Sequence, residues 1–155
     1  MSESKKEKYE RLLSLFKDTK KENKSIHLMT MYSELCNFLK NEFAYMDWVG
    51  FYLISDDKEE LYLGPYVGDS ACENISIYKG VCGKCYRERL TQRVDDVSHI
   101  LYHIACSSST KSEIVIPLMH NDECLGVLDI DSDNLSSFDK DDEQYLKSIC
   151  YIITK

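Results

Sequence analysis

The sequence predicts a single α+β domain in which helices flank a central antiparallel sheet. Apolar residues at helical spacing mark both ends of the 155-residue chain, and short β-prone runs fill its middle. No repeat, linker or low-complexity segment divides the chain, which is long enough to bury one core. We therefore expect one domain over residues 1–155, with residues 1–24 forming a partly peripheral helix.

Three long helices are expected from apolar side chains that recur every three or four residues. The first has the apolar stripe Tyr9, Leu12, Leu13 and Phe16. Ser25 can cap the second helix, whose apolar positions are Met29, Tyr32, Leu35, Cys36 and Leu39. The last begins near Asp139, and its apolar stripe is Leu146, Ile149, Cys150 and Ile153.

The first half of the sheet is expected from two runs of aromatic and β-branched residues. Residues 48–54 form one strand and end at Ser55. Residues 61–63 form its hairpin partner, which is expected to stop at Gly64-Pro65. Residues 83–90 then suit a short helix that begins just after Cys82.

The second half of the sheet contains the two most apolar strands. Residues 113–118 and 124–131 have this character, and the Asn121-Asp122 pair between them suits a hairpin turn. Residues 93–97 are expected to add a short strand, and the serine-rich residues 98–112 to form a loop.

Composition and charge exclude several classes of partner. The formal net charge is −8 without a basic stripe, so we expect neither nucleic acid nor an anionic membrane to bind. No apolar run is long enough to span a bilayer, and the first residues have no stretch of signal-peptide type. These features predict a cytoplasmic protein with reduced thiols. The sequence is compatible with a homodimer.

The seven cysteines divide into packing residues and candidates for chemistry, since an odd count argues against a structural disulfide framework. Cys36 and Cys150 lie on helical apolar stripes and Cys124 begins a strand, so packing is expected for all three. The others are Cys72, Cys82, Cys85 and Cys106. Residues 82–85 form one C-x-x-C pair, but no second pair completes a zinc site. Packing inside a helix is favoured for Cys85, and a role as an extra resolving thiol stays open.

Two carboxylates lie on one face of an apolar strand. Asp129 and Asp131 are two residues apart, which places them on the same side of the strand at about 7 Å. Either this face is exposed to solvent, or the pair lines a pocket where a cationic group would relieve their repulsion. Trp48 and Tyr52 likewise share one face, with Gly50 between them. They form either core packing or an aromatic wall for a small apolar group such as an S-methyl.

Seven segments together carry a family resemblance. They are residues 48–53, 63–66, 71–72, 79–83, 103–106, 112–118 and 126–132. In this order the series closely resembles the free methionine-(R)-sulfoxide reductases, the catalytic branch of the GAF-domain family, over residues 26–154. The resemblance implies a GAF-type fold and an enzyme that reduces free methionine-(R)-sulfoxide to methionine. A GAF fold alone is also compatible with a sensor module that binds a small ligand without turnover.

The resemblance also implies roles for three cysteines. Cys106 matches the nucleophile, Cys72 the resolving cysteine and Cys82 a third redox cysteine, which is the other candidate nucleophile. A thiolate attacks the sulfoxide sulfur, the nucleophile becomes a sulfenic acid, and a second thiol converts it to a disulfide. An external dithiol, expected to be thioredoxin, reopens this bond. No metal or organic cofactor is required.

The acidic and aromatic residues acquire roles by the same resemblance. Glu113, Asp129 and Asp131 match the acidic groups of the site, one of which protonates the departing oxygen. Trp48 and Tyr52 match its aromatic wall. The sequence departs from the family at two loop positions, since Ser107 replaces the usual Asp and Tyr102 the usual Gly.

Overall fold

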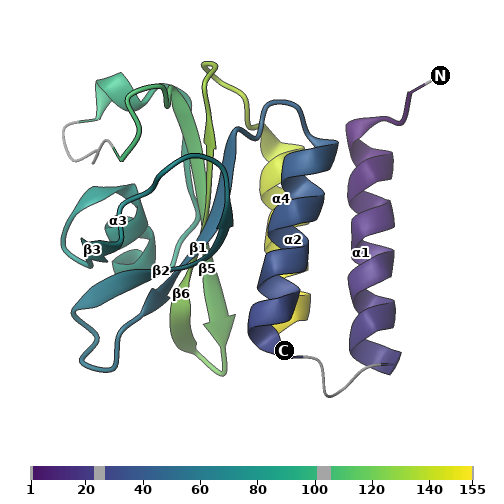
Figure 1. Cartoon of the computed structure of the whole chain (residues 1–155), viewed down its shortest axis with the longest axis horizontal. Coiled ribbons are helices and arrows are strands. Elements are labelled where there is room, and N and C mark those ends of the chain that lie inside the picture. The colour runs from purple at the N-terminus through teal and green to yellow at the C-terminus, as the bar shows by residue number, and fades with distance from the viewer. Residues whose placement is uncertain (1, 23–26, 101–105, 155) are drawn as a thin grey trace.

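The computed structural model describes residues 2–22, 27–100 and 106–154. It confirms the α+β class, with a six-stranded antiparallel sheet between layers of helices (Figure 1). Ser25, Tyr102 and His103, which the sequence singled out, lie outside the described residues. No helix in the described ranges is long and apolar enough to cross a membrane.

The sheet has the strand order β3-β2-β1-β6-β5-β4, and each strand is antiparallel to its neighbours. Its strands are β1 (Trp48–Ile54), β2 (Glu60–Val67), β3 (Asn74–Ser76), β4 (Gln92–Val94), β5 (Ser112–His120) and β6 (Glu123–Ser132). The long strands β1, β6 and β5 are adjacent at the centre. Their alternating side chains therefore determine what each face of the sheet presents.

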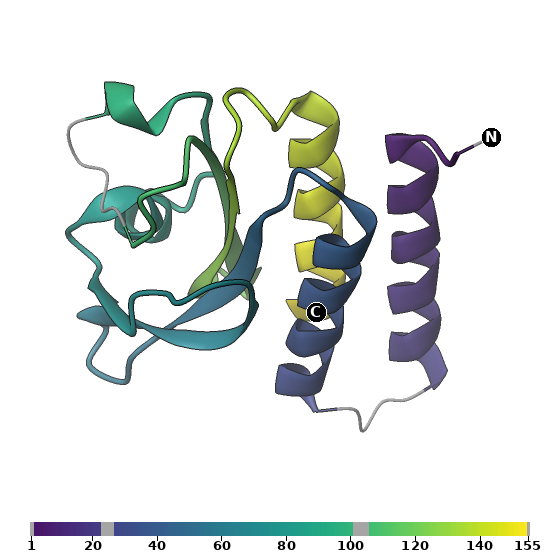
Figure 2. The same cartoon turned by 45° about the horizontal axis from the view of Figure 1, so that its top comes forward.

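The helices are distributed unequally over the two faces of the sheet (Figure 2). Their bounds are α1 (Lys5–Glu22), α2 (Leu28–Glu42), α3 (Gly80–Glu88) and α4 (Lys140–Thr154), with a 3-10 turn η1 (Val97–His99). Helices α2 and α4 cover one face, and α1 packs outside them. The short helix α3 and the neighbouring loops cover the other face.

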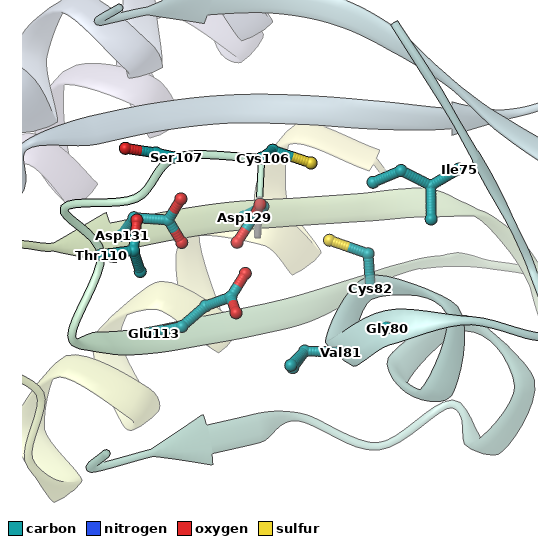
Figure 3. A pocket seen from close by; sticks show the side chains of 10 residues that line it. All are labelled: Ile75, Gly80, Val81, Cys82, Cys106, Ser107, Thr110, Glu113, Asp129 and Asp131. Atoms are coloured by element: carbon teal, nitrogen blue, oxygen red, sulfur yellow. The ribbon is translucent and has the colours of Figure 1, made fainter. Parts of the chain in front are cut away.

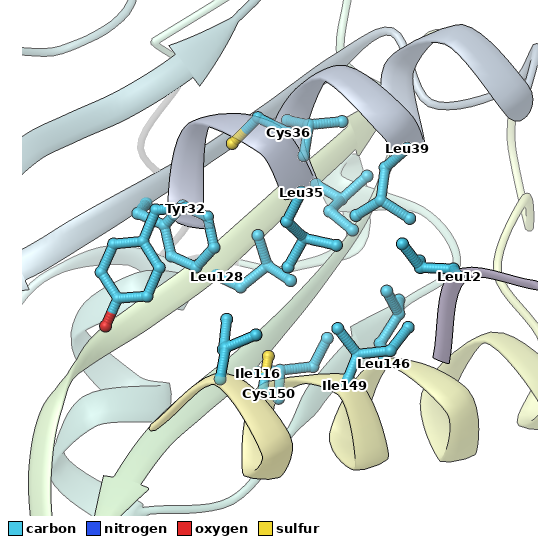
Figure 4. Close-up of a cluster of buried hydrophobic side chains, with 14 of the residues drawn as sticks. Leu12, Tyr32, Leu35, Cys36, Leu39, Ile116, Leu128, Leu146, Ile149 and Cys150 are labelled. Carbon is cyan, nitrogen blue, oxygen red and sulfur yellow. The ribbon is translucent and has the colours of Figure 1, made fainter. Parts of the chain in front are cut away.

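The main core lies between the sheet and α2 and α4 (Figure 4). Ile116 and Leu128 from the central strands meet Leu35 of α2 and Ile149 of α4, and all four are at most 1% exposed. The expected packing roles of Cys36 and Cys150 are confirmed by their burial in this layer. Burial raises the pKa of the Cys36 thiol to about 12, so this cysteine stays protonated and unreactive.

Helix α1 is attached to α4 through a buried carboxylate. Asp142 is fully buried, and its Oδ1 accepts hydrogen bonds from the hydroxyls of Tyr9 and Tyr45 at 2.6 Å each. Its Oδ2 accepts from Lys5 Nζ at 2.9 Å and from the backbone N–H of Asp139 at 2.9 Å. Tyr9 is itself fully buried. The inner face of α1 therefore belongs to the core, although the helix forms the outermost layer.

Two helix starts differ from the sequence expectation. Helix α2 is capped by His27 rather than Ser25, and the His27 Nδ1 atom accepts from the Met29 N–H at 3.1 Å. Helix α3 begins at Gly80, three residues before the expected start at 83. The glycines of this segment disfavour a helix, but burial of Val81 and Cys82 against the sheet compensates for that preference.

Two strands also differ from expectation. Strand β2 does not stop at Gly64-Pro65 but continues to Val67, because two residues there face one residue of β1 in a β-bulge. A bulge accommodates the missing N–H of Pro65. The expected strand 93–97 is shorter and ends at Val94, and the three-residue strand β3 was not anticipated. The β5–β6 hairpin turn is confirmed, with positive φ angles at Asn121 and Asp122.

Candidate active site

The second face of the central strands carries the candidate site. In the register of the sheet, Glu113 of β5 faces Asp131 of β6, which faces Trp48 of β1. Two residues earlier in β6, Asp129 faces Gly50 of β1. The pleat therefore gathers both aspartates, Glu113 and Trp48 on one side of the sheet.

This polar face is largely covered, so the solvent-face alternative is wrong for Asp129, while Asp131 is partly buried. Asp129 and Glu113 are each only 5% exposed. Helix α3 packs over them and contributes Val81 and Cys82 to a second hydrophobic cluster, which also contains Trp48. The alternate residues of β5 and β6 point to the other face of the sheet and pack in the main core. Their apolar side chains explain why both strands look apolar in sequence.

Cysteines from three separate segments converge above the carboxyl groups. Cys72 and Cys106 are joined by a disulfide, with their Cα atoms 5.4 Å apart. Cys82, in the first turn of α3, is a free, buried thiol. Its sulfur and carboxylate oxygens of Glu113 and Asp129 lie within 4.8 Å of one another. The three cysteines expected at the site therefore lie together, with Cys72 and Cys106 as the bonded pair.

The electrostatics of the cluster favour neutral forms. Burial, followed by the charges of Asp129 and Asp131, raises the pKa of Glu113 well above its usual value. Burial and the charge of Asp129 also raise the pKa of Asp131, while hydrogen bonding with Glu113 and then Thr110 opposes this shift. The pKa of Cys82 is raised well above its usual value by burial and then by Asp129 and Glu113. The cluster therefore retains at least one carboxyl proton near neutral pH, and Cys82 stays a thiol.

The aromatic residues form the adjoining wall. Trp48 is 7% exposed and stacks on Tyr52, with ring centroids 6.0 Å apart. Both side chains border a small pocket that Cys106 and Asp131 also line. Trp48 and Tyr52 therefore lie beside Cys106 and the aspartates, and their role as an aromatic wall for the substrate stays a prediction.

A cavity connects the carboxyl groups with the sulfur atoms (Figure 3). It is lined by Ile75, Gly80, Val81, Cys82, Cys106, Ser107, Thr110, Glu113, Asp129 and Asp131. With the disulfide formed its volume is about 30 Å³, enough for a water molecule. Sequence reasoning missed Ile75 and Thr110, which lie in segments without a clear pattern. Ser107, which differs from the usual family residue, also lines the cavity, and its hydroxyl is 2.9 Å from that of Ser109.

Metal binding at this site would have to use Cys82, Glu113 and Asp129, the cluster of potential ligands found among the described residues. Three ligands resemble an open site rather than the closed four-ligand site of structural zinc. Cys85 does not join them. Its fully buried sulfur lies 3.6 Å from the carbonyl oxygen of Val115, so the expected packing role is confirmed.

Comparison with known proteins agrees with this architecture. The sequence profile of the GAF domain matches residues 27–154. GAF domain-containing protein A of Dictyostelium discoideum is 43% identical over 97% of this chain and 92% of its own length. The chain belongs to the GAF domain family.

Within this family the chain is similar to a named group of oxidoreductases, which confirms the resemblance found in the sequence. Free methionine-R-sulfoxide reductase of Escherichia coli is 43% identical over 67% of this chain, and the match spans 62% of that enzyme. The solved free methionine-R-sulfoxide reductase of Neisseria meningitidis, in complex with its substrate, is 36% identical. It superposes with a TM-score of 0.87 over 99% of this chain and 91% of its own.

Proposed function

We propose that this protein reduces free methionine-(R)-sulfoxide to methionine with Cys106 as nucleophile. The observation that carries the proposal is one site in which a redox-capable cysteine pair lies beside two buried carboxyl groups and a third that is partly buried. A module that only bound a ligand would not need two cysteines at bonding distance beside a proton donor. The similarity to enzymes of this name supports the same substrate.

The first chemical step uses Cys106 and a protonated carboxyl group. The reduced Cys106 thiolate attacks the sulfoxide sulfur, and the sulfoxide oxygen needs a proton as its bond to sulfur weakens. Glu113 is the best donor, because its raised pKa keeps its proton available near neutral pH. Transfer of the oxygen from the sulfoxide to the Cys106 sulfur leaves Cys106 as a sulfenic acid and releases methionine.

The second step regenerates the enzyme. The Cys72 thiol displaces water from the Cys106 sulfenic acid, forming the disulfide seen in the structure. An external dithiol such as thioredoxin then reduces this disulfide and is itself oxidised. Reduction frees the Cys106 sulfur for a new attack, so it must precede the next turnover.

Substrate selectivity follows from the charges in the site. A free amino acid brings an ammonium group, which can pair with the carboxylates of Asp129 and Asp131. A peptide-bound methionine sulfoxide offers a neutral amide and would leave a buried carboxylate uncompensated. In this proposal Trp48 and Tyr52 contact the S-methyl group, and the reaction requires neither a metal nor an organic cofactor.

A single-turnover experiment tests this proposal. The protein is reduced with dithiothreitol, desalted and mixed with one equivalent of L-methionine-(R)-sulfoxide, and methionine is quantified by mass spectrometry. We expect close to one equivalent of methionine, and little from the S epimer or from the N-acetylated R form. Tight binding of the R epimer without methionine release would favour a sensor module. Equal release from the N-acetylated form would contradict ammonium recognition.

A further inference from the structure

The segment that carries Cys72 is held by side chains from the centre of the sheet. Residues 69–72 lie between β2 and β3. Trp48 Nε1 donates a hydrogen bond to the backbone carbonyl of Asp69 at 3.1 Å. The Tyr52 hydroxyl donates one to the backbone carbonyl of Cys72 at 2.9 Å. Within the described part of the chain, these are the hydrogen bonds that residues 69–72 form, and both donors belong to β1.

The indole that holds Asp69 is itself fixed by its surroundings. It stacks on Tyr66 with ring centroids 5.7 Å apart. Gly68 adopts a φ of +139°, and a Cβ there would lie 2.6 Å from Trp48 Cδ1. A Cβ on Gly50 would lie 2.6 Å from Tyr66 Cβ and would also clash with the Trp48 ring. Two glycines therefore clear the space that this indole occupies against the segment.

The Tyr52 hydroxyl stays protonated and can therefore donate this hydrogen bond at every physiological pH. Its side chain is 1% exposed, and burial followed by the charge of Asp129 raises its pKa above the ordinary value of 10. The hydroxyl therefore keeps its proton throughout the physiological pH range. It is directed at the carbonyl of Cys72 itself, the residue whose sulfur bonds to Cys106.

We propose that Tyr52 and Trp48 are positioning residues that hold Cys72 where it can form its disulfide with Cys106. This inference deepens the proposed function and rests on it for its biological purpose. Cys72 and Cys106 are 34 residues apart and lie in separate loops. Fixing the backbone of one loop to a central strand reduces the conformational freedom that disulfide formation must remove. The two aromatic residues thus serve the recycling of the enzyme in addition to forming the wall of the pocket.

The equilibrium constant for forming the Cys72–Cys106 disulfide measures this positioning directly. Purified full-length protein is equilibrated with mixtures of reduced and oxidised glutathione. In this exchange the protein dithiol and one oxidised glutathione give the protein disulfide and two reduced glutathiones. After acid quench and alkylation, mass spectrometry of the Cys72 and Cys106 peptides gives the equilibrium constant.

Tyr52→Phe keeps the ring and removes only the hydroxyl, and Tyr66→Phe is the matched control. Tyr66 is also next to Trp48, but its hydroxyl forms no hydrogen bond to residues 69–72 in the described structure. We expect Tyr52→Phe to shift the equilibrium toward the dithiol by about 2- to 10-fold, the effect of one lost hydrogen bond. Tyr66→Phe should match the wild type.

Equal constants for Tyr52→Phe and wild type would overturn the proposal, as would an equal shift in Tyr66→Phe. Circular dichroism checks folding, and Trp48→Phe provides a second variant if Tyr52→Phe is poorly folded. That variant lacks the Asp69 contact and should shift the equilibrium in the same direction.

The measurement uses no methionine sulfoxide, so its outcome is independent of the proposed reductase activity. A protein that forms the disulfide normally but does not release methionine would contradict the proposed function and leave the positioning role intact.

Discussion

Replacing Glu113 by Gln should change how the stability of the protein depends on pH, as well as abolish its proposed proton donation. Burial and the charges of Asp129 and Asp131 raise the pKa of Glu113 in the folded state well above the ordinary 4.5. The glutamine amide keeps an N–H donor for these carboxyl groups and cannot titrate. Glu113→Gln therefore resembles the protonated wild type in its packing but has no proton to give.

The sign and size of the effect follow from proton linkage. A carboxyl group whose pKa is raised on folding contributes stability that is fully present below its unfolded pKa. That contribution is lost as the pH rises toward the folded pKa, because the unfolded chain has then released a proton that the folded chain retains. In this window the free energy of unfolding falls by about 1.4 kcal/mol per pH unit for each such group. For Glu113 this fall begins above its ordinary pKa of 4.5 and continues until the pH reaches its raised pKa in the folded state.

Urea unfolding of the disulfide form at pH 5, 6, 7 and 8 measures this slope. Wild type should lose stability as the pH rises above the ordinary pKa of Glu113, and below the raised pKa Glu113→Gln should lose about 1.4 kcal/mol per pH unit less. Glu59→Gln, at an exposed position, is the matched control and should follow the wild type. Parallel pH profiles for wild type and Glu113→Gln would refute the idea that Glu113 is protonated in the folded state.

Further substitutions, each compared with a control or a stated threshold, test the site and the core. Cys106→Ser should abolish methionine release in the single-turnover experiment, whereas Cys72→Ser should still release one equivalent, since only recycling is blocked; release by Cys106→Ser would point to Cys82 as nucleophile. Asp131→Asn should lower kcat/KM by about 100-fold or more, the effect of removing one partner of a buried ion pair, while the exposed Asp141→Asn should change little. Comparable values for the two variants would argue against ammonium pairing. Asp142→Ala removes a buried carboxylate that accepts four hydrogen bonds, one of them from the fully buried Tyr9, and should destabilise the fold by about 3–5 kcal/mol in urea unfolding; a change below 1 kcal/mol would show that this network contributes little.

Local sequence patterns identified much of the fold and part of the site. The period-2 alternation of β6 placed Asp129 and Asp131 on one face, and the structure confirms this parity. Apolar stripes identified α1, α2 and α4 with small errors at their ends. Such predictions succeed because strand pleat and helical turn are properties of neighbouring residues.

Other features depended on contacts between distant segments. Helix α3 begins at Gly80 because Val81 and Cys82 are buried against the sheet, which no local propensity reports. Strand β2 continues past Pro65 because a bulge absorbs the missing N–H. Position 27 caps α2 with a histidine, a residue type that ordinary capping preferences do not favour.

By itself, then, the sequence determined the fold class, the shared face of the two aspartates and the set of residues that resemble an active site. Only the tertiary structure decided that this face is buried, that Glu113 joins the aspartates across the strand register, and that Cys72 meets Cys106. It also decided that Trp48 and Tyr52 donate hydrogen bonds to the backbone carbonyls of Asp69 and Cys72. The physical reason is that burial, pKa shifts and thiol pairing depend on distances between residues far apart in sequence, whereas pleat and periodicity depend on neighbours alone.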